Sequence, residues 1–247
     1  MARLSVNLNK VALLRNSRRT GVPDLLHFGR IALDAGAAGL TVHPRPDERH
    51  IRRGDVPALA ALMQPLRPKI EFNIEGYPDA RMQAILEEVT PEQCTFVPDA
   101  PDAFTSEEGW KLDAAQLALA RPAVAAAKTL GCRVVLFIDP DPGVVPRARD
   151  AGADGIEIYT GGYADAFRNG RGADDVLARI AATAQQAQDL GLVVNAGHDL
   201  NLRNIPPLMR VVPFLAEASI GHELTADALE TGFAAAVRAY AAALRGA

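Results

Sequence analysis

Short apolar runs alternate with longer segments of helical periodicity from one end of the chain to the other. Gly, Pro or Asp bounds these runs, as is typical of strands that are buried on both faces in a parallel sheet. The pattern predicts strands at residues 4–8, 39–43, 69–74, 93–97, 133–138, 155–159, 192–195 and 214–220. It predicts helices at residues 23–34, 79–88, 112–130, 144–150, 173–190 and 225–244.

The connections from helix to strand share one form. DAGAAG (34–39), DAGADG (150–155) and DLGL (189–192) each join the end of a helix to a strand through a glycine turn. Repetition of this kind is characteristic of βαβ units. Eight units in 247 residues, with no Pro- or Ser-rich linker, predict a single (β/α)₈ TIM barrel domain spanning residues 1–247. An open doubly wound sheet is the alternative, although such sheets typically contain only five or six strands.

The composition excludes several classes of protein. An apolar share of 49% excludes a disordered chain, and a net charge of −4 gives no general attraction to nucleic acid or to anionic membranes. No stretch reaches the roughly 18 apolar residues of a membrane span, and the first residues do not resemble a signal peptide. Two cysteines are too few for a disulfide framework. We therefore expect a cytoplasmic protein that binds neither nucleic acid nor membrane.

In a barrel of this kind, functional side chains lie at the ends of strands and in the loops that follow them. Four of the five histidines fall at such positions, and only His27 lies in a predicted helix. The polar residues and glycine at these positions are Asn7, Asn9, His43, Arg45, His50, Glu75, Asp99, Asp139, Glu157, Asn195, His198, Gly221 and His222. One face of the barrel is therefore expected to carry the chemistry.

His43 and His198 are the strongest candidates for proton transfer. Each follows an apolar strand, and an imidazole can act as an acid or a base near pH 7. Glu75 and Glu157 lie in nearly continuous apolar stretches, so each needs a raised pKa or an arginine partner. The two carboxylates are thus either catalytic or structural. Asp139, in an Asp-Pro turn, is expected to be structural.

Two regions are candidates for binding phosphate. The loops after the seventh and eighth strands, NAGHD and SIGHE, contain Gly197 and Gly221, whose backbone N–H groups an anion can approach closely. The second region is a cluster of basic residues in the first quarter of the chain, namely Lys10, Arg15, Arg18, Arg19, Arg45, Arg49, Arg52 and Arg53. We expect this cluster to bind phosphate, to face a partner subunit or to form an ordinary solvated surface.

Metal and Schiff-base chemistry are both disfavoured by the sequence. His43 and His50 are seven residues apart, which is no recognised ligand spacing, and HExxH is absent. No lysine ends a predicted strand facing the site, which argues against an aldolase that uses a lysine Schiff base. We expect no metal and no cofactor.

The chain contains, in order, the motifs VNLNKVALLRNSR, TVHPRPDERHI, FNIEG, FTSEEGW, GIEIYTGGYA, VNAGHDL and SIGHELTADAL. In this combination they resemble the pyridoxine 5′-phosphate synthase family, from Leu4 to about Leu229. The resemblance implies a TIM barrel with extra helices, assembled as a homo-octamer that is a tetramer of dimers. It also implies a cofactor-free condensation of 3-amino-2-oxopropyl phosphate with 1-deoxy-D-xylulose 5-phosphate, giving pyridoxine 5′-phosphate, phosphate and water.

The resemblance also assigns roles by position. His43 matches the first proton acceptor, Glu75 a second acceptor and His198 the proton donor, while Glu157 matches a carboxylate that stabilises a charged transition state. The positions that match contacts to the amino-ketone phosphate are Asn7, Arg18, Asp199, Gly221 and His222, with Arg18 supplied across a dimer interface. The positions that match contacts to deoxyxylulose phosphate are Asn9, Lys10, Arg45, His50 and Thr105.

Three departures from the family pattern affect these assignments. Many members have Asp-His where this chain has Asn9-Lys10, and glycine where it has Arg19 or Asp199. None of these changes removes a predicted proton-transfer residue. The alternatives are another phosphosugar-binding barrel, such as an epimerase or aldolase, or a pseudoenzyme that acts through its oligomer surface.

Overall fold

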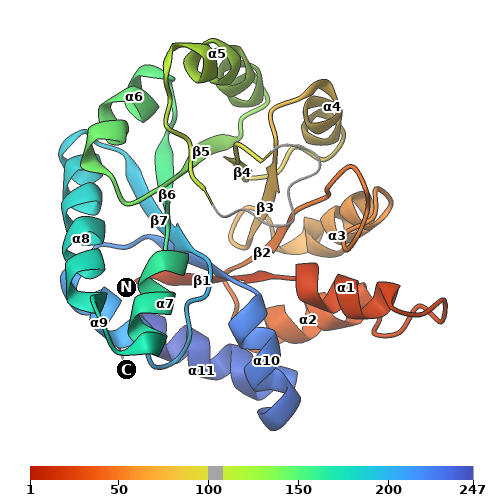
Figure 1. The fold of residues 1–247 in the computed structure, drawn as a ribbon. Coiled ribbons are helices and arrows are strands. Elements are labelled where there is room, and N and C mark those ends of the chain that lie inside the picture. Colours follow the sequence, from red (N-terminus) through yellow and green to blue (C-terminus); the bar gives the residue numbers. More distant parts are fainter. Residues whose placement is uncertain (100–107, 247) are drawn as a thin grey trace.

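Eight parallel strands close into a barrel in which each strand pairs with its neighbours in chain order (Figure 1). The computed structural model describes residues 1–99 and 108–246. The strands are β1 (Arg3–Asn7), β2 (Gly39–Val42), β3 (Glu71–Gly76), β4 (Gln93–Phe96), β5 (Arg133–Ile138), β6 (Gly155–Tyr159), β7 (Val193–Gly197) and β8 (Glu217–Ile220). The predicted (β/α)₈ barrel is confirmed.

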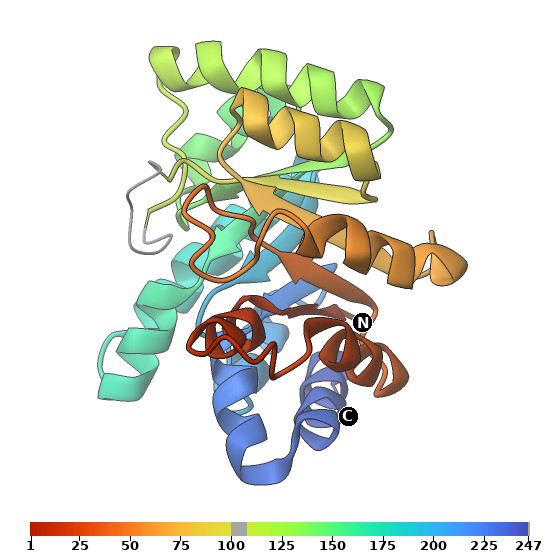
Figure 2. The same ribbon diagram turned by 90° about the vertical axis from the view of Figure 1, so that its right-hand side faces the viewer.

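Helices surround the strands on all sides (Figure 1), and α5, α4 and α3 follow one another down one flank (Figure 2). The α-helices are α1 (Asn9–Asn16), α2 (Leu25–Asp34), α3 (Asp55–Met63), α4 (Ala80–Val89), α5 (Ala114–Thr129), α6 (Val145–Asp150), α7 (Gly161–Asn169), α8 (Ala173–Asp189), α9 (Ile205–Val211), α10 (His222–Thr231) and α11 (Phe233–Arg245). Short 3₁₀ turns lie at Gln64–Leu66 and Pro142–Val144. In the described part of the chain, no helix has both the length and the apolar character needed to span a bilayer.

Extra helices follow three of the strands, so the fold is a barrel with additions. Both α1 and α2 lie between β1 and β2, both α7 and α8 lie between β6 and β7, and α10 precedes α11 at the end of the chain. The last helix packs against α2, α9 and β1, and so completes the outer ring of the barrel.

The predicted strands agree closely with the structure, and the differences affect the site. Two strands, β5 and β6, have the predicted bounds at both ends. The third strand was predicted at residues 69–74 but runs from Glu71 to Gly76. It begins later because residue 70 is still in a turn, with its N–H bonded to the carbonyl of Leu66. It ends later because Gly76 still pairs with Phe96 of β4. Glu75 therefore lies within β3 rather than after it. Likewise, Glu157 is the third residue of β6 and does not close it.

The helix predictions were less complete. The single helix expected at 225–244 is two helices, α10 and α11, because Gly232 interrupts it with a φ of +87°, a conformation that glycine adopts readily. The sequence pattern did not reveal α1, α3, α7 and α9. Each of these four helices has fewer than ten residues, so its periodicity is weak.

The inside of the barrel is unusually polar for this fold. A chain of hydrogen bonds crosses its middle, in which Ser5 Oγ lies 2.7 Å from Thr41 Oγ1 and Asn73 Nδ2 donates to the same Thr41 oxygen at 3.4 Å. Thr95 Oγ1 in turn donates to Asn73 Oδ1 at 3.2 Å. Four adjacent strands, β1 to β4, are thus linked by side chains as well as by their backbones.

A charged layer closes the barrel at the amino ends of the strands. Glu71 accepts hydrogen bonds from Arg3 Nη1 at 2.7 Å and from the Arg133 guanidinium. Gln93 accepts from Arg133 Nη2 at 2.8 Å and donates to Glu217 Oε1 at 3.0 Å. The arginines hold the pKa of Glu71 below its usual value against the opposing effect of burial, so this carboxylate is ionised.

We predict that Glu71→Ala destabilises the protein by about 2–4 kcal/mol, because it leaves two guanidinium groups without their shared partner inside the barrel. Chemical denaturation at pH 7 measures this. Asp165→Ala removes an exposed carboxylate from its pair with Arg168 and is the matched control, with an expected change below about 0.5 kcal/mol. Equal effects of the two substitutions would contradict the structural role of Glu71.

Candidate active site

Four side chains predicted to be catalytic meet at the carboxyl ends of the strands. His43 directly follows β2 and His198 directly follows β7, while Glu75 and Glu157 point inward from β3 and β6. His43 Nδ1 lies 3.9 Å from Glu75 Oε2. The two imidazoles and the two carboxyl groups are also electrostatically coupled, since His198 acts on His43 and Glu75 acts on Glu157. The structure therefore brings all four together.

Glu75 is buried among polar groups, without an arginine. Asn7 Nδ2 donates to its Oε2 at 3.4 Å, and Ser219 Oγ lies 3.5 Å from its Oε1. No arginine forms an ion pair with Glu75 among the described residues. Burial raises the pKa of Glu75 to about 7, and the nearby Asp99 carboxylate contributes to the increase. This carboxyl group is thus ready to exchange a proton near neutral pH.

Glu157 is more isolated still. It is 2% exposed, and across residues 1–99 and 108–246 its carboxyl group has no hydrogen bond or ion pair. Burial raises its pKa well above the usual range, and the proximity of Glu75 adds to this. Gly197 on the neighbouring strand makes room for the carboxyl group, since a Cβ atom there would lie 2.1 Å from Glu157 Oε1. Within the described residues, neither Glu75 nor Glu157 forms the structural ion pair with an arginine that was the alternative expectation.

His43 is held through its backbone. Its N–H donates to Asn9 Oδ1 at 2.9 Å, and the Asn9 N–H donates to Asn7 Oδ1 at 2.9 Å. Burial lowers the pKa of His43 well below its usual value, and the Arg45 guanidinium lowers it further. The imidazole is therefore neutral at pH 7 and able to accept a proton. Asn9 supplies a side-chain oxygen here, a function that an aspartate at this position can also perform.

The His50 ring lies beside His43, with 6.2 Å between ring centroids. Its Nδ1 accepts the backbone N–H of Ile51 at 2.9 Å, so a neutral ring carries its proton on Nε2. Burial, with help from Arg45, lowers the pKa of His50 to about 4. At neutral pH this histidine is a hydrogen-bond donor without charge.

His198 packs against two aromatic rings, which also contact each other, at a sharp backbone turn. Its ring centroid is 4.9 Å from that of Phe137 and 5.3 Å from that of Tyr159. Burial lowers the pKa of His198, against the opposing effect of the Asp199 and Asp99 carboxylates. The φ angles of residues 198 and 199 are +80° and +57°, in the left-handed region that non-glycine residues seldom occupy.

Half of the basic cluster is neutralised inside the chain. Arg45 pairs with Asp99 at 3.0 Å, and Arg15 binds both oxygens of Asp55. Arg49 and Arg53 also form ion pairs, with Asp47 and Glu88. The other four members form no ion pair within the described residues, namely Lys10, Arg18, Arg19 and Arg52. Lys10 lies in the first turn of α1, near enough to His50 and His198 to lower the pKa of each.

One predicted substrate contact is not brought into this site, and another lies outside the described residues. Arg18 is exposed on the loop after α1, which extends away from the barrel (Figure 1). Thr105 lies outside the described residues. Asp139 was expected to be structural, as part of an Asp-Pro turn. Its side chain accepts the N–H of Gly109 at 3.1 Å and pairs with Lys111. The side chain that caps the following turn is that of Asp141.

The start of α10 provides backbone donors at the mouth of the barrel. Gly221 precedes this ten-residue helix, whose first residue, His222, is exposed, and no side chain caps its N–H groups. A Cβ atom at residue 221 would lie 3.0 Å from the carbonyl oxygen of Asn7, so glycine permits β1 and α10 to approach closely. Such a helix start binds anions through its N–H groups and its dipole.

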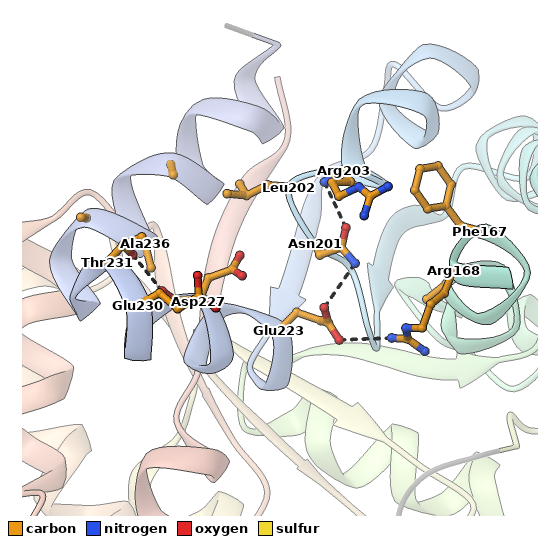
Figure 3. A pocket seen from close by; sticks show the side chains of 13 residues that line it. Phe167, Arg168, Asn201, Leu202, Arg203, Glu223, Asp227, Glu230, Thr231 and Ala236 are labelled. Atoms are coloured by element: carbon orange, nitrogen blue, oxygen red, sulfur yellow. Dashed lines mark hydrogen bonds and ion pairs between the residues drawn. The ribbon is translucent and has the colours of Figure 1, made fainter. Parts of the chain in front are cut away.

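A cavity of about 670 Å³ lies at the edge of this face, between α7, the loop after β7, and helices α10 and α11 (Figure 3). Glu223 at its centre accepts from Asn201 Nδ2 at 3.2 Å and pairs with Arg168 at 3.4 Å. None of the four predicted catalytic residues lines this cavity. It is therefore distinct from the cluster of histidines and carboxylates.

Sequence reasoning missed two residues that contact this cluster. Ser219 faces Glu75 from β8, and Thr160 contacts the backbone of His198. A serine or threonine in or beside an apolar run gives no signal comparable to that of Asp99, which was noted as a polar residue after a strand and pairs with Arg45. No set of three or more His, Cys, Asp or Glu side chains suited to holding a metal occurs in the parts of the chain that the structure describes.

Solved structures with similar folds are distant in sequence. A tryptophan synthase chain from M. tuberculosis matches with a TM-score of 0.64 at 13% identity, covering 98% of this chain and 92% of that one. A chain of the BexX/CysO complex from Amycolatopsis orientalis matches with a TM-score of 0.62 at 17% identity, covering 100% and 91%. At these identities the likeness establishes the fold alone.

Curated relatives are much closer in sequence. Proteins named pyridoxine 5′-phosphate synthase are 52% identical in Allorhizobium ampelinum, over 97% of this chain and 96% of theirs, and 52% identical in Mesorhizobium japonicum, over 96% of each. One from Albidiferax ferrireducens is 50% identical over 96% of this chain and 95% of its own. The model of the family described as pyridoxal phosphate biosynthesis protein PdxJ matches residues 4–246. With its barrel, its histidine and carboxylate cluster and these relatives, the chain belongs to the PdxJ family.

Proposed function

We propose that this protein is a pyridoxine 5′-phosphate synthase. It joins 3-amino-2-oxopropyl phosphate to 1-deoxy-D-xylulose 5-phosphate and releases pyridoxine 5′-phosphate, phosphate and water, without a cofactor. The observation that carries the proposal is the convergence of two neutral histidines and two protonatable carboxyl groups at one end of a barrel of this family. The reaction needs repeated proton transfers, and these groups supply them.

The protonation states suit the proposed roles. His43, neutral at pH 7, takes the first proton from the substrates, and Glu75, with a pKa of about 7, takes a second when it is ionised. His198 is the donor, so it must first gain a proton during the reaction, because its lowered pKa leaves it neutral in the free protein. The 3.9 Å separation of His43 and Glu75 permits a proton to pass between them through a modest movement.

Glu157 stabilises positive charge on the reacting amine nitrogen. In the free protein its raised pKa keeps this carboxyl group protonated. A cationic nitrogen nearby favours the ionised form, so substrate binding lowers the pKa of Glu157 and creates the negative charge only where it is needed. An ionised partner in a buried site interacts strongly with the developing charge.

Separate groups hold the two phosphates. The amino-ketone phosphate binds at the start of α10, near Gly221 and His222, with Asn7 and the backbone N–H of Asp199. Arg18 reaches this phosphate from a second subunit, which fits its exposed position without an ion pair among the described residues. Arg side chains and backbone N–H groups form strong charge-assisted bonds to phosphate.

Deoxyxylulose phosphate binds on the opposite side, near Arg45, His50 and Lys10, with Thr105 and the backbone at Asn9. His50 donates through Nε2, since Nδ1 is occupied by the N–H of Ile51. Lys10 replaces the histidine of many relatives and offers a full positive charge to the phosphate.

We further propose that the protein is cytoplasmic, binds small phosphorylated substrates rather than nucleic acid, and acts as one barrel domain. Its assembly is a homo-octamer, a tetramer of dimers. Exposed apolar side chains Leu13 and Leu14 on α1, next to Arg18, support a subunit contact at this helix.

The function is tested by mixing the purified protein with both substrates and following pyridoxine 5′-phosphate fluorescence together with phosphate release. We expect product that requires both substrates and persists with a metal chelator, because the site supplies its own acids and bases. Loss of activity with the chelator favours a metal-dependent epimerase or aldolase. Binding of both substrates without turnover, by folded protein, would identify a pseudoenzyme.

We predict that His43→Ala abolishes turnover while the fold is retained, and that the wild-type rate falls as the pH drops below about 7. The physical reason for the pH effect is that Glu75 must be ionised to accept a proton, and its pKa is about 7. Steady-state rates from pH 5.5 to 9 measure this, and Glu75→Gln should be inactive throughout. Full activity of either variant would contradict its role.

The raised pKa of Glu75 also makes the free energy of unfolding depend on pH. Because the folded state binds the Glu75 proton more tightly than the unfolded state does, the wild type loses stability as the pH rises from about 4.5 through 7. Glu75→Gln does not titrate, so its stability relative to the wild type should improve by up to about 3 kcal/mol between pH 4 and pH 8. Denaturant titrations at both pH values check the direction.

We predict that Gly197→Ala lowers kcat on the order of 100-fold, because the new Cβ atom occupies the space of the Glu157 carboxyl group. Gly162→Ala is the matched control, since its Cβ atom would meet no heavy atom within 4 Å and its rate should stay within about twofold of the wild type. A fully active, folded Gly197→Ala would show that Glu157 does not need this space.

A further inference from the structure

Thr160 makes an unusual set of contacts at the end of β6. It is fully buried and directly precedes α7. Its Oγ1 lies 2.6 Å from the carbonyl oxygen of Gly197 and 2.5 Å from that of His198, and its own N–H donates to the Gly197 carbonyl at 2.9 Å. A threonine on one strand end thus contacts two successive carbonyls on the next.

These contacts differ from the ordinary role of threonine at this position. A threonine immediately before a helix usually accepts an N–H from the first helical turn. Thr160 makes no such bond. Its hydroxyl hydrogen is directed to the carbonyls instead. The Gly197 carbonyl also accepts the backbone N–H of Thr160, whereas the hydroxyl is the one donor that reaches the His198 carbonyl within the described residues.

The backbone that Thr160 contacts is strained. His198 and Asp199 have consecutive positive φ angles, and neither is glycine. Left-handed residues of this kind persist only where neighbouring groups hold them. Asn204 Nδ2 donates to the carbonyl of Asp199 at 3.0 Å, so the second carbonyl of the turn is also fixed. The direction of the His198 ring depends on the φ and ψ angles that these two side chains maintain.

We propose that Thr160 is a positioning residue for the reaction, which holds the His198 backbone so that its imidazole packs against Phe137 and Tyr159 at the barrel mouth. This rests on the proposed role of His198 as proton donor. Thr160 touches no reacting atom in this proposal. It acts only through the carbonyl of His198, and its hydroxyl is the part that matters.

The test compares Thr160→Val, which keeps the shape and removes the hydroxyl, with Thr160→Ser, which keeps the hydroxyl. We expect the valine variant to lose kcat on the order of 10- to 100-fold, since an error of about 1 Å in the position of a catalytic group has an effect of this size. KM for deoxyxylulose phosphate should stay within about threefold, because its proposed contacts do not include the turn at His198 and Asp199, and serine should restore kcat to within about threefold.

Thr183→Val is the matched control. Thr183 is fully buried and donates its hydroxyl to the Arg179 carbonyl at 2.8 Å, but it lies on α8, outside the barrel mouth. Its kcat should be unchanged. An unchanged kcat for Thr160→Val, an equal loss for Thr183→Val, or no rescue by serine would each overturn the proposal. If Thr160→Val does not fold, Thr160→Ala removes the hydroxyl with less crowding and carries the same expectations.

A crystal structure of Thr160→Val gives a readout that does not depend on activity. We expect the His198 ring to move from its place against the Phe137 and Tyr159 rings, and an unmoved ring would overturn the positioning role. His198→Gln, assayed in parallel, tests the donor role by itself. Full activity of that variant would disprove the role of His198, whereas the position of the ring in Thr160→Val would still report on the contact made by Thr160.

Discussion

Desolvation inside the closed barrel is the constraint on which the rest of the site depends. Glutamates project inward at both ends of the barrel, and their pKa values are shifted in opposite directions at the two ends. At the amino end, Arg3 and Arg133 keep Glu71 ionised in spite of its burial. At the carboxyl end, Glu157 has no such partner among the described residues, so burial raises its pKa. One residue type is therefore an ionised structural group in one layer and a carboxyl group with a raised pKa in the other.

Desolvation also keeps the reactive end close to electrical neutrality. The same burial that protonates carboxyl groups deprotonates imidazoles, so His43 and Glu157 both lack charge at pH 7. A cavity with several ionised carboxylates would repel two phosphorylated substrates. A neutral cluster does not, and it still contains groups that give and take protons. In the proposed function, the phosphates are held by cations and by backbone N–H groups at the rim, separate from the groups proposed to react.

The sequence predicted the barrel well because buried parallel strands form short apolar runs whose spacing survives errors of a few residues. It predicted the position of His43 and His198 for the same reason, since each follows such a run. It did not predict Ser219 or Thr160, because a small hydroxyl residue within or beside an apolar run is usual in any strand. Nor did it predict that the Glu157 carboxyl group reaches the space beside Gly197, because this depends on the register in which Glu157 pairs with Asn195, two residues before Gly197 on β7. Short helices such as α9 were missed because too few residues set their periodicity.

Two departures from the family pattern, Asn9 and Asp199, are explained by the one atom or backbone angle that each position requires. Asn9 uses one side-chain oxygen to accept the N–H of His43, and an aspartate at this position presents an equivalent oxygen. Asp199 occupies a left-handed conformation in which glycine is favoured, and among other residues asparagine and aspartate tolerate it best. Its proposed function needs only its backbone N–H. Substitution is therefore permitted at both positions, within limits set by an acceptor atom in one case and by the backbone φ angle in the other.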